Sequence, residues 1–324
     1  MDLSERLGRH LAESRLLDGA QRVVVACSGG GDSTALLILL REWARERGVS
    51  IVALHVHHGL RGPRGEEDAG FCARLASDLG LPFGLRPVDV PSNRRPGESL
   101  EAAARRLRYE AFLAFARETG EKTLVATGHT LDDQAETVLL NLHRHAGRTR
   151  GGIRARREDG VVRPLLPFSR AELRAFLAAR GAAWREDETN ENERLFRNRI
   201  RRRELPALEA AAPGTARRLA RAGEAWTRRL EVIDVRIDEA LAAGDTPLSG
   251  PWPRALVVAL GAEAAARLLV RASGARGAVP GRAQLSRAVE RLLKGEAQLA
   301  ESLAGLRLVA DTRAVRLAGR ASLP

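Results

Sequence analysis

The sequence predicts an α/β protein, with a doubly wound parallel sheet in its first part and a mostly helical second part. Short β-branched runs alternate with amphipathic stretches in about the first half of the chain, and a glycine-rich turn follows the first run. Later stretches have helical periodicity, with strand patterns only at the end. With 324 residues there is room for two domains, which we expect at 1–210 and 211–324.

The elements of the first domain alternate in order. Strands are expected at 23–27, 51–57, 83–90, 123–127 and 161–166, and helices at 33–47, 100–119, 132–143, 170–180 and 192–205. Pro206 is expected to stop the last helix. The Arg/Gly-rich stretch 144–159 lacks periodicity, which is typical of an exposed basic loop.

The second domain is expected to begin with a long helix that ends at Ala243. A linker at 245–253, helices over 254–296 and a hairpin of 306–309 with 314–317 should follow.

The charge balance favours a polyanionic partner. Lys and Arg number 53 against 41 Asp and Glu, which gives a net charge of +12 and a pI near 11.1. Clustered guanidinium groups bind nucleic-acid phosphates by releasing counterions. Because only two of these cations are lysines, an Arg-rich composition is the alternative explanation of the charge.

The two cysteines, Cys27 and Cys72, are too few for a disulfide framework or a cysteine metal site, so we expect both to be buried. The first twenty residues are too charged for the core of a signal peptide. No segment reaches the ~18 apolar residues of a membrane span. We therefore expect a cytoplasmic protein without a membrane partner.

A glycine-rich turn between the first strand and its helix is the most informative motif. Its residues are Ser28, Gly29, Gly30, Gly31, Asp32 and Ser33. Glycine amides and a helix N-terminus together suit a phosphate or pyrophosphate, and the absence of Gly-Lys-Ser/Thr disfavours a Walker A loop. Asp32 would repel phosphate unless it holds a cation, so Mg²⁺ is expected. The alternative is a simple turn with Asp32 as a helix cap.

A second group of polar residues follows the fourth strand: Gly128, His129, Asp132, Asp133 and Glu136. Their spacing places His129 and the three acids on one helix face. Carboxylates so close together repel unless they bind Mg²⁺ or the ammonium group of an amino acid. The alternative is a helix start that attracts acids through its dipole.

Two further groups involve histidine and arginine. His55, His57 and His58 end the second strand without the ligands that would complete a zinc site, so we expect this strand end to contact a nucleotide. Arg105 and Arg108 lie within one helical turn and could clamp a phosphate. Exposed Glu/Arg pairs are the alternative.

The ordered motifs together resemble the PP-loop ATP pyrophosphatases and, among them, the tRNA(Ile)-lysidine synthetase family. The resemblance spans about residues 22 to 205 and rests on seven motifs: SGGxDS, HVxHGLR, ExxARxxRY, GHxxDDxxET, RPLL, WxxDxTN and RNxIR. It departs at residues 145–153, where the family has an RGxGLxGL-like loop. The chain is expected to be a short member without the family's additional C-terminal domain.

The resemblance implies a Rossmann-like fold, use of ATP and Mg²⁺, and a two-step reaction. ATP adenylates the wobble cytidine in the CAU anticodon of tRNA(Ile), and the ε-amine of free L-lysine then attacks the activated carbon. The oligomeric state is not indicated, and a homodimer is left open. Alternatives are a PP-loop tRNA thiolase, whose iron–sulfur type needs more cysteines than this chain has, and a non-catalytic tRNA-binding protein.

The implied roles are as follows. Residues 28–33 would grip pyrophosphate, with His55, His58 and Gly128 beside the nucleotide. Asp32 and Asp133 would position Mg²⁺. Arg105 and His129 would stabilise the α-phosphate, and Asp132 and Glu136 would recognise lysine. The residues expected to contact RNA are Arg148, Arg150, Arg197 and Arg201.

Overall fold

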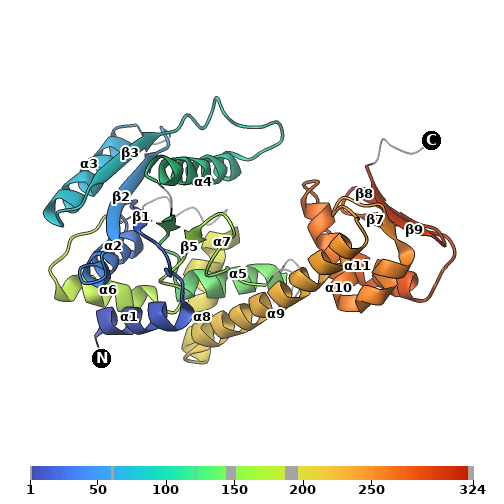
Figure 1. Ribbon diagram of the computed structural model, residues 1–324. Coiled ribbons are helices and arrows are strands. Elements are labelled where there is room, and N and C mark those ends of the chain that lie inside the picture. Colours follow the sequence, from blue (N-terminus) through green and yellow to red (C-terminus); the bar gives the residue numbers. More distant parts are fainter. Residues whose placement is uncertain (1, 60–61, 121, 144–150, 187–195, 320–324) are drawn as a thin grey trace. The chain divides into compact units, whose positions relative to one another are not determined.

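The computed structural model describes residues 2–59, 62–120, 122–143, 151–186 and 196–319. The chain packs as two compact units (Figure 1). The first comprises 1–134 and 154–202, and the second comprises 135–153 and 203–324. The domain boundary expected from the sequence, between 210 and 211, lies near residue 203, where the chain enters the second unit for the last time. The sequence did not indicate that 135–153 pack with the second unit.

A five-stranded parallel sheet forms the centre of the first unit, in the order β3-β2-β1-β4-β5. Its strands are β1 (Arg22–Ala26), β2 (Ser50–His57), β3 (Phe83–Pro87), β4 (Thr123–Ala126) and β5 (Val161–Val162). The predicted doubly wound sheet is therefore confirmed. The fifth strand is shorter than expected, and Pro164, which has no N–H to continue a strand ladder, follows just after it.

Seven helices begin in the described part of the first unit. They are α1 (Leu3–Ser14), α2 (Gly31–Ala44), α3 (Pro63–Asp78), α4 (Leu100–Glu118), α5 (Leu131–His143), α6 (Arg170–Ala179) and α7 (Phe196–Arg199). Helices α1 and α3 were not predicted from the sequence. None of the helices in the described ranges has both the length and the apolar character of a membrane span.

The expectation that Pro206 ends a helix was wrong. A π-helical turn (Ile200–Glu204) follows α7 and leads directly into α8 (Leu205–Ala211). Pro206 lies in the first turn of α8, where a backbone N–H is not needed for the helical ladder.

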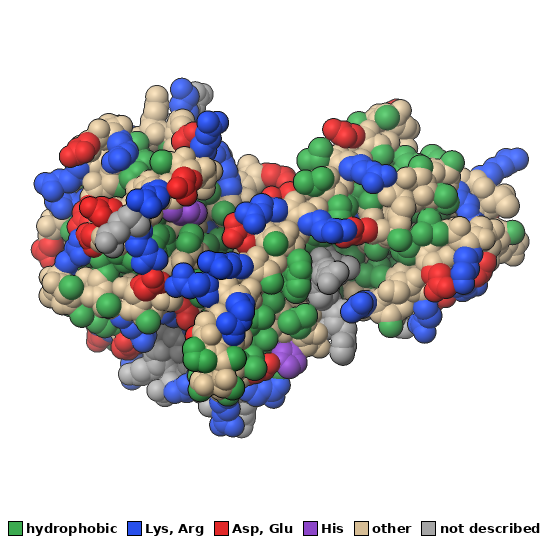
Figure 2. Space-filling model, turned by 90° about the horizontal axis from the view of Figure 1, so that it is seen from below, with side chains coloured by type: hydrophobic (Ala, Val, Ile, Leu, Met, Phe, Trp, Pro, Cys, Tyr) green, Lys and Arg blue, Asp and Glu red, His purple; other side chains and the backbone are tan. Residues whose placement is uncertain are grey.

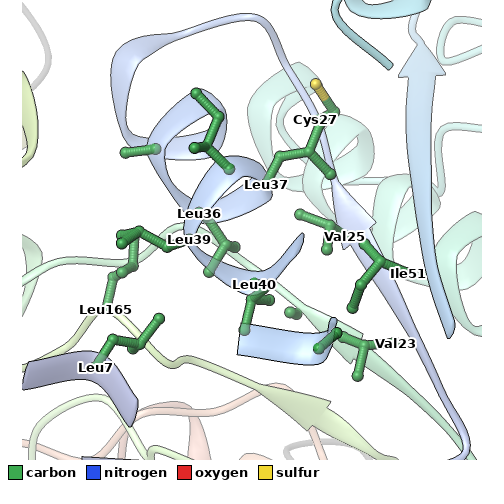
Figure 3. Close-up of a cluster of buried hydrophobic side chains, with 14 of the residues drawn as sticks. Leu7, Val23, Val25, Cys27, Leu36, Leu37, Leu39, Leu40, Ile51 and Leu165 are labelled. Carbon is green, nitrogen blue, oxygen red and sulfur yellow. The ribbon is translucent and has the colours of Figure 1, made fainter. Parts of the chain in front are cut away.

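The sheet buries both of its faces because successive strand residues point to opposite sides. On one face Val23 and Val25 pack with apolar side chains of α1, α2, α3 and α6 (Figure 3). On the other face Val24 packs against aromatic side chains of α4. Strand residues buried on both faces explain the continuous apolar runs in the sequence.

The strand order determines at which edge of the sheet a ligand can bind. From β1 the chain proceeds outward to β2 and β3, and it then returns to the other side of β1 to form β4 and β5. The connections that leave the carboxyl ends of β1 and β4 therefore diverge, and ligands of such sheets bind in the crevice between them.

The second unit combines helices with a small antiparallel sheet. The helices that follow α8 are α9 (Thr215–Ala243), α10 (Arg254–Gly274) and α11 (Arg282–Leu293), and the sheet has the order β6-β9-β8-β7. Its strands are β6 (Trp252–Pro253), β7 (Leu299–Leu303), β8 (Leu306–Ala310) and β9 (Ala314–Ala318). The expected terminal hairpin is confirmed as β8 with β9, whereas β6 and β7 were not expected.

One buried cation ties the sheet of the second unit to its helices. The guanidinium of Arg254 donates to the backbone oxygens of Leu292 at 3.1 Å, Glu296 at 2.6 Å and Asp311 at 2.8 Å. These oxygens lie at the end of α11, in the turn before β7 and in the turn between β8 and β9. Arg254 is only 8% exposed, so water does not readily replace its guanidinium as a donor.

Arg254→Met should destabilise the second unit by about 3 kcal/mol, because it keeps most of the apolar volume but removes a buried charged donor from three carbonyl groups. Arg307→Met is the control, because Arg307 is exposed on β8 of the same sheet. Urea unfolding of the full chain measures the difference. Equal stability of the two variants would contradict the structural role of Arg254.

Candidate active site

The turn after β1 has the geometry of a phosphate-binding loop. Gly29 has φ +84°, a left-handed conformation that glycine adopts without strain, and α2 begins two residues later. The hydroxyl of Ser33 donates to the carbonyl oxygen of Gly30 at 3.0 Å and accepts the backbone N–H of Ser28 at 3.1 Å. The loop therefore closes on itself at the N-terminus of a buried helix, where amides favour an anion.

The turn after β4 approaches this loop closely at Gly128. A Cβ atom at Gly128 would lie 3.2 Å from the carbonyl carbon of Asp32 and from the amide nitrogen of Ser33. Any larger residue would push the turn away from α2. The structure thus brings the motifs at 28–33 and 128–133 together at one edge of the sheet.

Three carboxylates at this edge converge on one cation, Arg170 in the first turn of α6. Its guanidinium lies 2.6 Å from Asp133 and 3.4 Å from Asp32. Its backbone N–H donates to the carboxylate of Asp132 at 2.8 Å. Asp132 and Asp133 come from α5, so Arg170 joins α2, α5 and α6.

The pKa values of the half-buried Asp32 and the buried Asp133 shift in opposite directions in this arrangement. Burial raises the pKa of Asp32 to about 6, against the attraction of Arg170 and with the repulsion of Asp133. Burial would also raise the pKa of Asp133, but the charges of Arg170 and Arg197 hold it below its usual range. Asp133 is therefore the ionised partner of the arginines, and Asp32 carries a charge that lacks full compensation.

His129 is half-buried between β4 and α5. Its Nδ1 is 3.0 Å from the hydroxyl oxygen of Thr127. Burial lowers the pKa of His129 to about 3, and the nearby charges of Arg163 and Arg105 act in the same direction. Near neutral pH the ring is uncharged, so it could reach a phosphate as a hydrogen-bond donor but not as a cation.

Two of the arginines expected to contact RNA also lie at this edge. Arg197 and Arg201 approach the carboxylate of Asp133 at 3.3 and 3.1 Å. The other two, Arg148 and Arg150, lie outside the described residues. Basic side chains are spread over much of the face shown in Figure 2, with acidic ones between them.

The remaining predicted residues are more dispersed. His55 is buried beneath the loop, with Nδ1 2.9 Å from the carbonyl oxygen of Cys27. His58 accepts a hydrogen bond from Arg108 at 3.0 Å. The exposed Arg105 holds its guanidinium 5.2 Å from the ring centre of Tyr109.

Glu136 is fully buried on α5, one turn beyond the two aspartates, and belongs to the second unit. It shares their helix, as the spacing predicted.

The most important residue that the sequence reading missed is Arg170. A cation in the first turn of a helix is unfavourable, because it faces the positive end of the helix dipole. Here Ser169 caps the helix and Arg170 follows it at once. That mismatch was a signal that the arginine pairs with carboxylates elsewhere in the fold.

The structure does not assemble a ready metal site among the residues it describes. Within those residues no group of three or more His, Cys, Asp and Glu side chains is arranged to hold an ion. Asp32 and Asp133, the expected Mg²⁺ ligands, are both paired with Arg170.

Asp32→Asn should stabilise the protein at neutral pH in buffer that contains EDTA. Because the pKa of Asp32 is raised by folding, the folded state loses stability as pH rises from about 4 to about 6, and asparagine avoids this loss. The gain should reach at most about 3 kcal/mol at pH 7 and vanish near pH 4. Thermal unfolding across this range measures it, with the exposed Asp78→Asn as control. If Asp32→Asn lowers stability at pH 7, the burial of an uncompensated charge is refuted.

Comparison with known proteins finds similarity to one group of enzymes. The chain is 46% identical over 220 residues to a tRNA(Ile)-lysidine synthase of Thermus thermophilus, which covers 68% of this chain and 42% of the relative. It is 39% identical over 298 residues to a tRNA(Ile)-lysidine synthase of Alkalilimnicola ehrlichii, covering 90% of this chain and 64% of the relative. The chain thus spans less than two thirds of the length of either relative.

Among solved structures, a U34-tRNA thiolase from Methanococcus maripaludis, with its [4Fe-4S] cluster, has a similar fold. It superposes with a TM-score of 0.55 at 18% identity and covers 68% of this chain and 77% of that one. At this identity the likeness concerns the fold alone. A family model described as a PP-loop domain matches residues 2–208, which include every element of the candidate site. The chain belongs to the PP-loop domain family.

Proposed function

We propose that the protein is an ATP-dependent carbon–nitrogen ligase acting on tRNA, of the tRNA(Ile)-lysidine synthetase type. One observation carries the proposal: a phosphate-binding loop and three carboxylates meet at one edge of a parallel sheet. The family match and the named relatives favour this reaction over others that use the same fold.

In the proposed reaction the carbonyl oxygen of the wobble cytosine attacks the α-phosphorus of ATP, and pyrophosphate leaves. The ε-amine of L-lysine then attacks the activated ring carbon and AMP leaves, so that a C–N bond replaces the C–O bond. The site must therefore bind pyrophosphate, hold two substrates in register and exclude water from the activated base.

Different residues perform these tasks. Residues 28–33 bind pyrophosphate through backbone amides and the helix N-terminus. Arg105 and the uncharged His129 donate hydrogen bonds to the α-phosphate, where charge develops during adenylation. Asp132 and Glu136 recognise the ammonium group of lysine or accept its proton.

The residues at the edge fit Mg²⁺ in part. Asp32 suits the ion because its half-buried carboxylate has a raised pKa and a charge that Arg170 offsets only in part. Asp133 holds the ion only if its arginine partners release it, since Arg170, Arg197 and Arg201 all pair with its carboxylate. When bound, Mg²⁺ neutralises charge on the phosphates.

The tRNA partner is the least constrained part of the proposal. Arg148, Arg150, Arg197 and Arg201 contact RNA phosphates, in tRNA(Ile) with the CAU anticodon. For Arg197 and Arg201 this contact competes with their pairing to Asp133. We further propose that the protein works in the cytoplasm, and a homodimer would be compatible with these roles.

Purified protein incubated with ATP, Mg²⁺, labelled lysine and a tRNA(Ile) transcript should release AMP and pyrophosphate and incorporate lysine at the wobble position. Asp32→Ala should lower AMP formation by about 100-fold, because it removes the carboxylate that positions the cation. Asp78→Ala, which removes an exposed carboxylate of α3, should leave the rate unchanged.

Nucleoside mass analysis identifies the product. AMP release with sulfur, and not lysine, incorporated into the tRNA would indicate a thiolase. Binding of tRNA without AMP formation would indicate a non-catalytic protein. Wild-type rates in Asp32→Ala would remove Asp32 from the mechanism.

A further inference from the structure

A short segment that runs beside the phosphate loop contributes a residue to which none of the motifs assigns a role. The backbone N–H of Arg185 donates to the carbonyl oxygen of Gly29 at 2.9 Å, and Gly30 and Arg185 form a parallel β-bridge. A Cβ atom on Gly31 would lie 3.5 Å from the ring of Trp184. The segment 184–185 thus lies along the loop.

The side chain of Arg185 fixes this segment to α3. Its guanidinium pairs with Asp68 at 2.5 Å and with Glu67 at 3.0 Å. Asp68 is only 16% exposed, so this pair is better shielded from solvent than an ordinary surface ion pair. The aliphatic part of the side chain also passes close to Gly29.

The contact at Gly29 determines how the loop can present its amides. In a planar trans peptide the C=O and N–H groups point in opposite directions. With the oxygen of Gly29 bound to the backbone N–H of Arg185, the N–H of Gly30 points away from Arg185. Gly29 is in a left-handed conformation and has no side chain to restrict it, so contacts must fix this peptide. The hydroxyl of Thr34 on α2 also donates to the Gly29 oxygen at 3.3 Å, and the shorter contact from Arg185 adds a hold from outside the loop.

We propose that Arg185 is a positioning residue for the phosphate loop, which sets its affinity for the phosphates of ATP through the ion pair with α3. This inference rests on the ATP use of the proposed function. It concerns a residue that acts through the loop and does not itself touch the substrate.

The test measures Mg·ATP binding and steady-state kinetics of the full chain for Arg185→Ala, Arg185→Lys and Arg228→Ala. We expect Arg185→Ala to raise the Kd and KM for ATP by about 10-fold, with kcat at saturating ATP and the KM for lysine retained. Arg185→Lys should restore most of the affinity, because it keeps a cation near Asp68. Arg228→Ala is the matched control, because it removes the same charge from an exposed ion pair with Glu224 on α9.

A reciprocal variant tests the ion pair itself. Asp68→Ala should weaken ATP binding in the same way, and adding it to Arg185→Ala should cost little more, because both changes break one contact.

The outcomes separate this inference from the function. If the wild type binds ATP and Arg185→Ala binds it equally well, or if Arg185→Ala lowers kcat alone, the positioning role is overturned while the function stands. If the wild type neither binds ATP nor forms AMP, the proposed function fails and this inference fails with it.

Discussion

The candidate site depends on the neutralisation of carboxylates at the carboxyl edge of the sheet. Asp133 is almost completely buried and would be costly without a partner, because an isolated charge loses its hydration there. Arg170 supplies the partner and also reaches Asp32, so one guanidinium holds α2, α5 and α6 in register. The remaining imbalance stays on Asp32, the acid nearest the phosphate loop. The Mg²⁺ proposed for this site would offset that charge.

The proposed RNA contacts and the proposed nucleotide contacts would share one set of charges. Arg197 and Arg201 share Asp133 with Arg170, so a phosphate that attracts them would return negative charge to the edge. A cation would then bind more readily beside Asp32. The proposed RNA contacts would therefore favour the proposed nucleotide contacts without a large movement of the chain.

Local sequence patterns predicted the parallel sheet and the loop after its first strand, because each pattern depends only on residues close together in the sequence. The alternation of Val23, Val24 and Val25 into opposite faces and the glycines at 29–31 indicated the sheet and the loop correctly. What the sequence could not supply were partners distant along the chain. Asp133 meets arginines 37, 64 and 68 residues away, and no spacing rule connects them. The predicted magnesium pair overlooked Arg170 for this reason.

The most direct test of the account is the position of a divalent ion beside a bound nucleotide. Crystals grown with Mn²⁺ and α,β-methylene ATP should give an anomalous peak at coordination distance from the Asp32 carboxylate, with the triphosphate on the amides of residues 28–33. A peak on another surface, or a nucleotide bound away from this edge, would contradict the claim that the loop and the carboxylates serve one ligand.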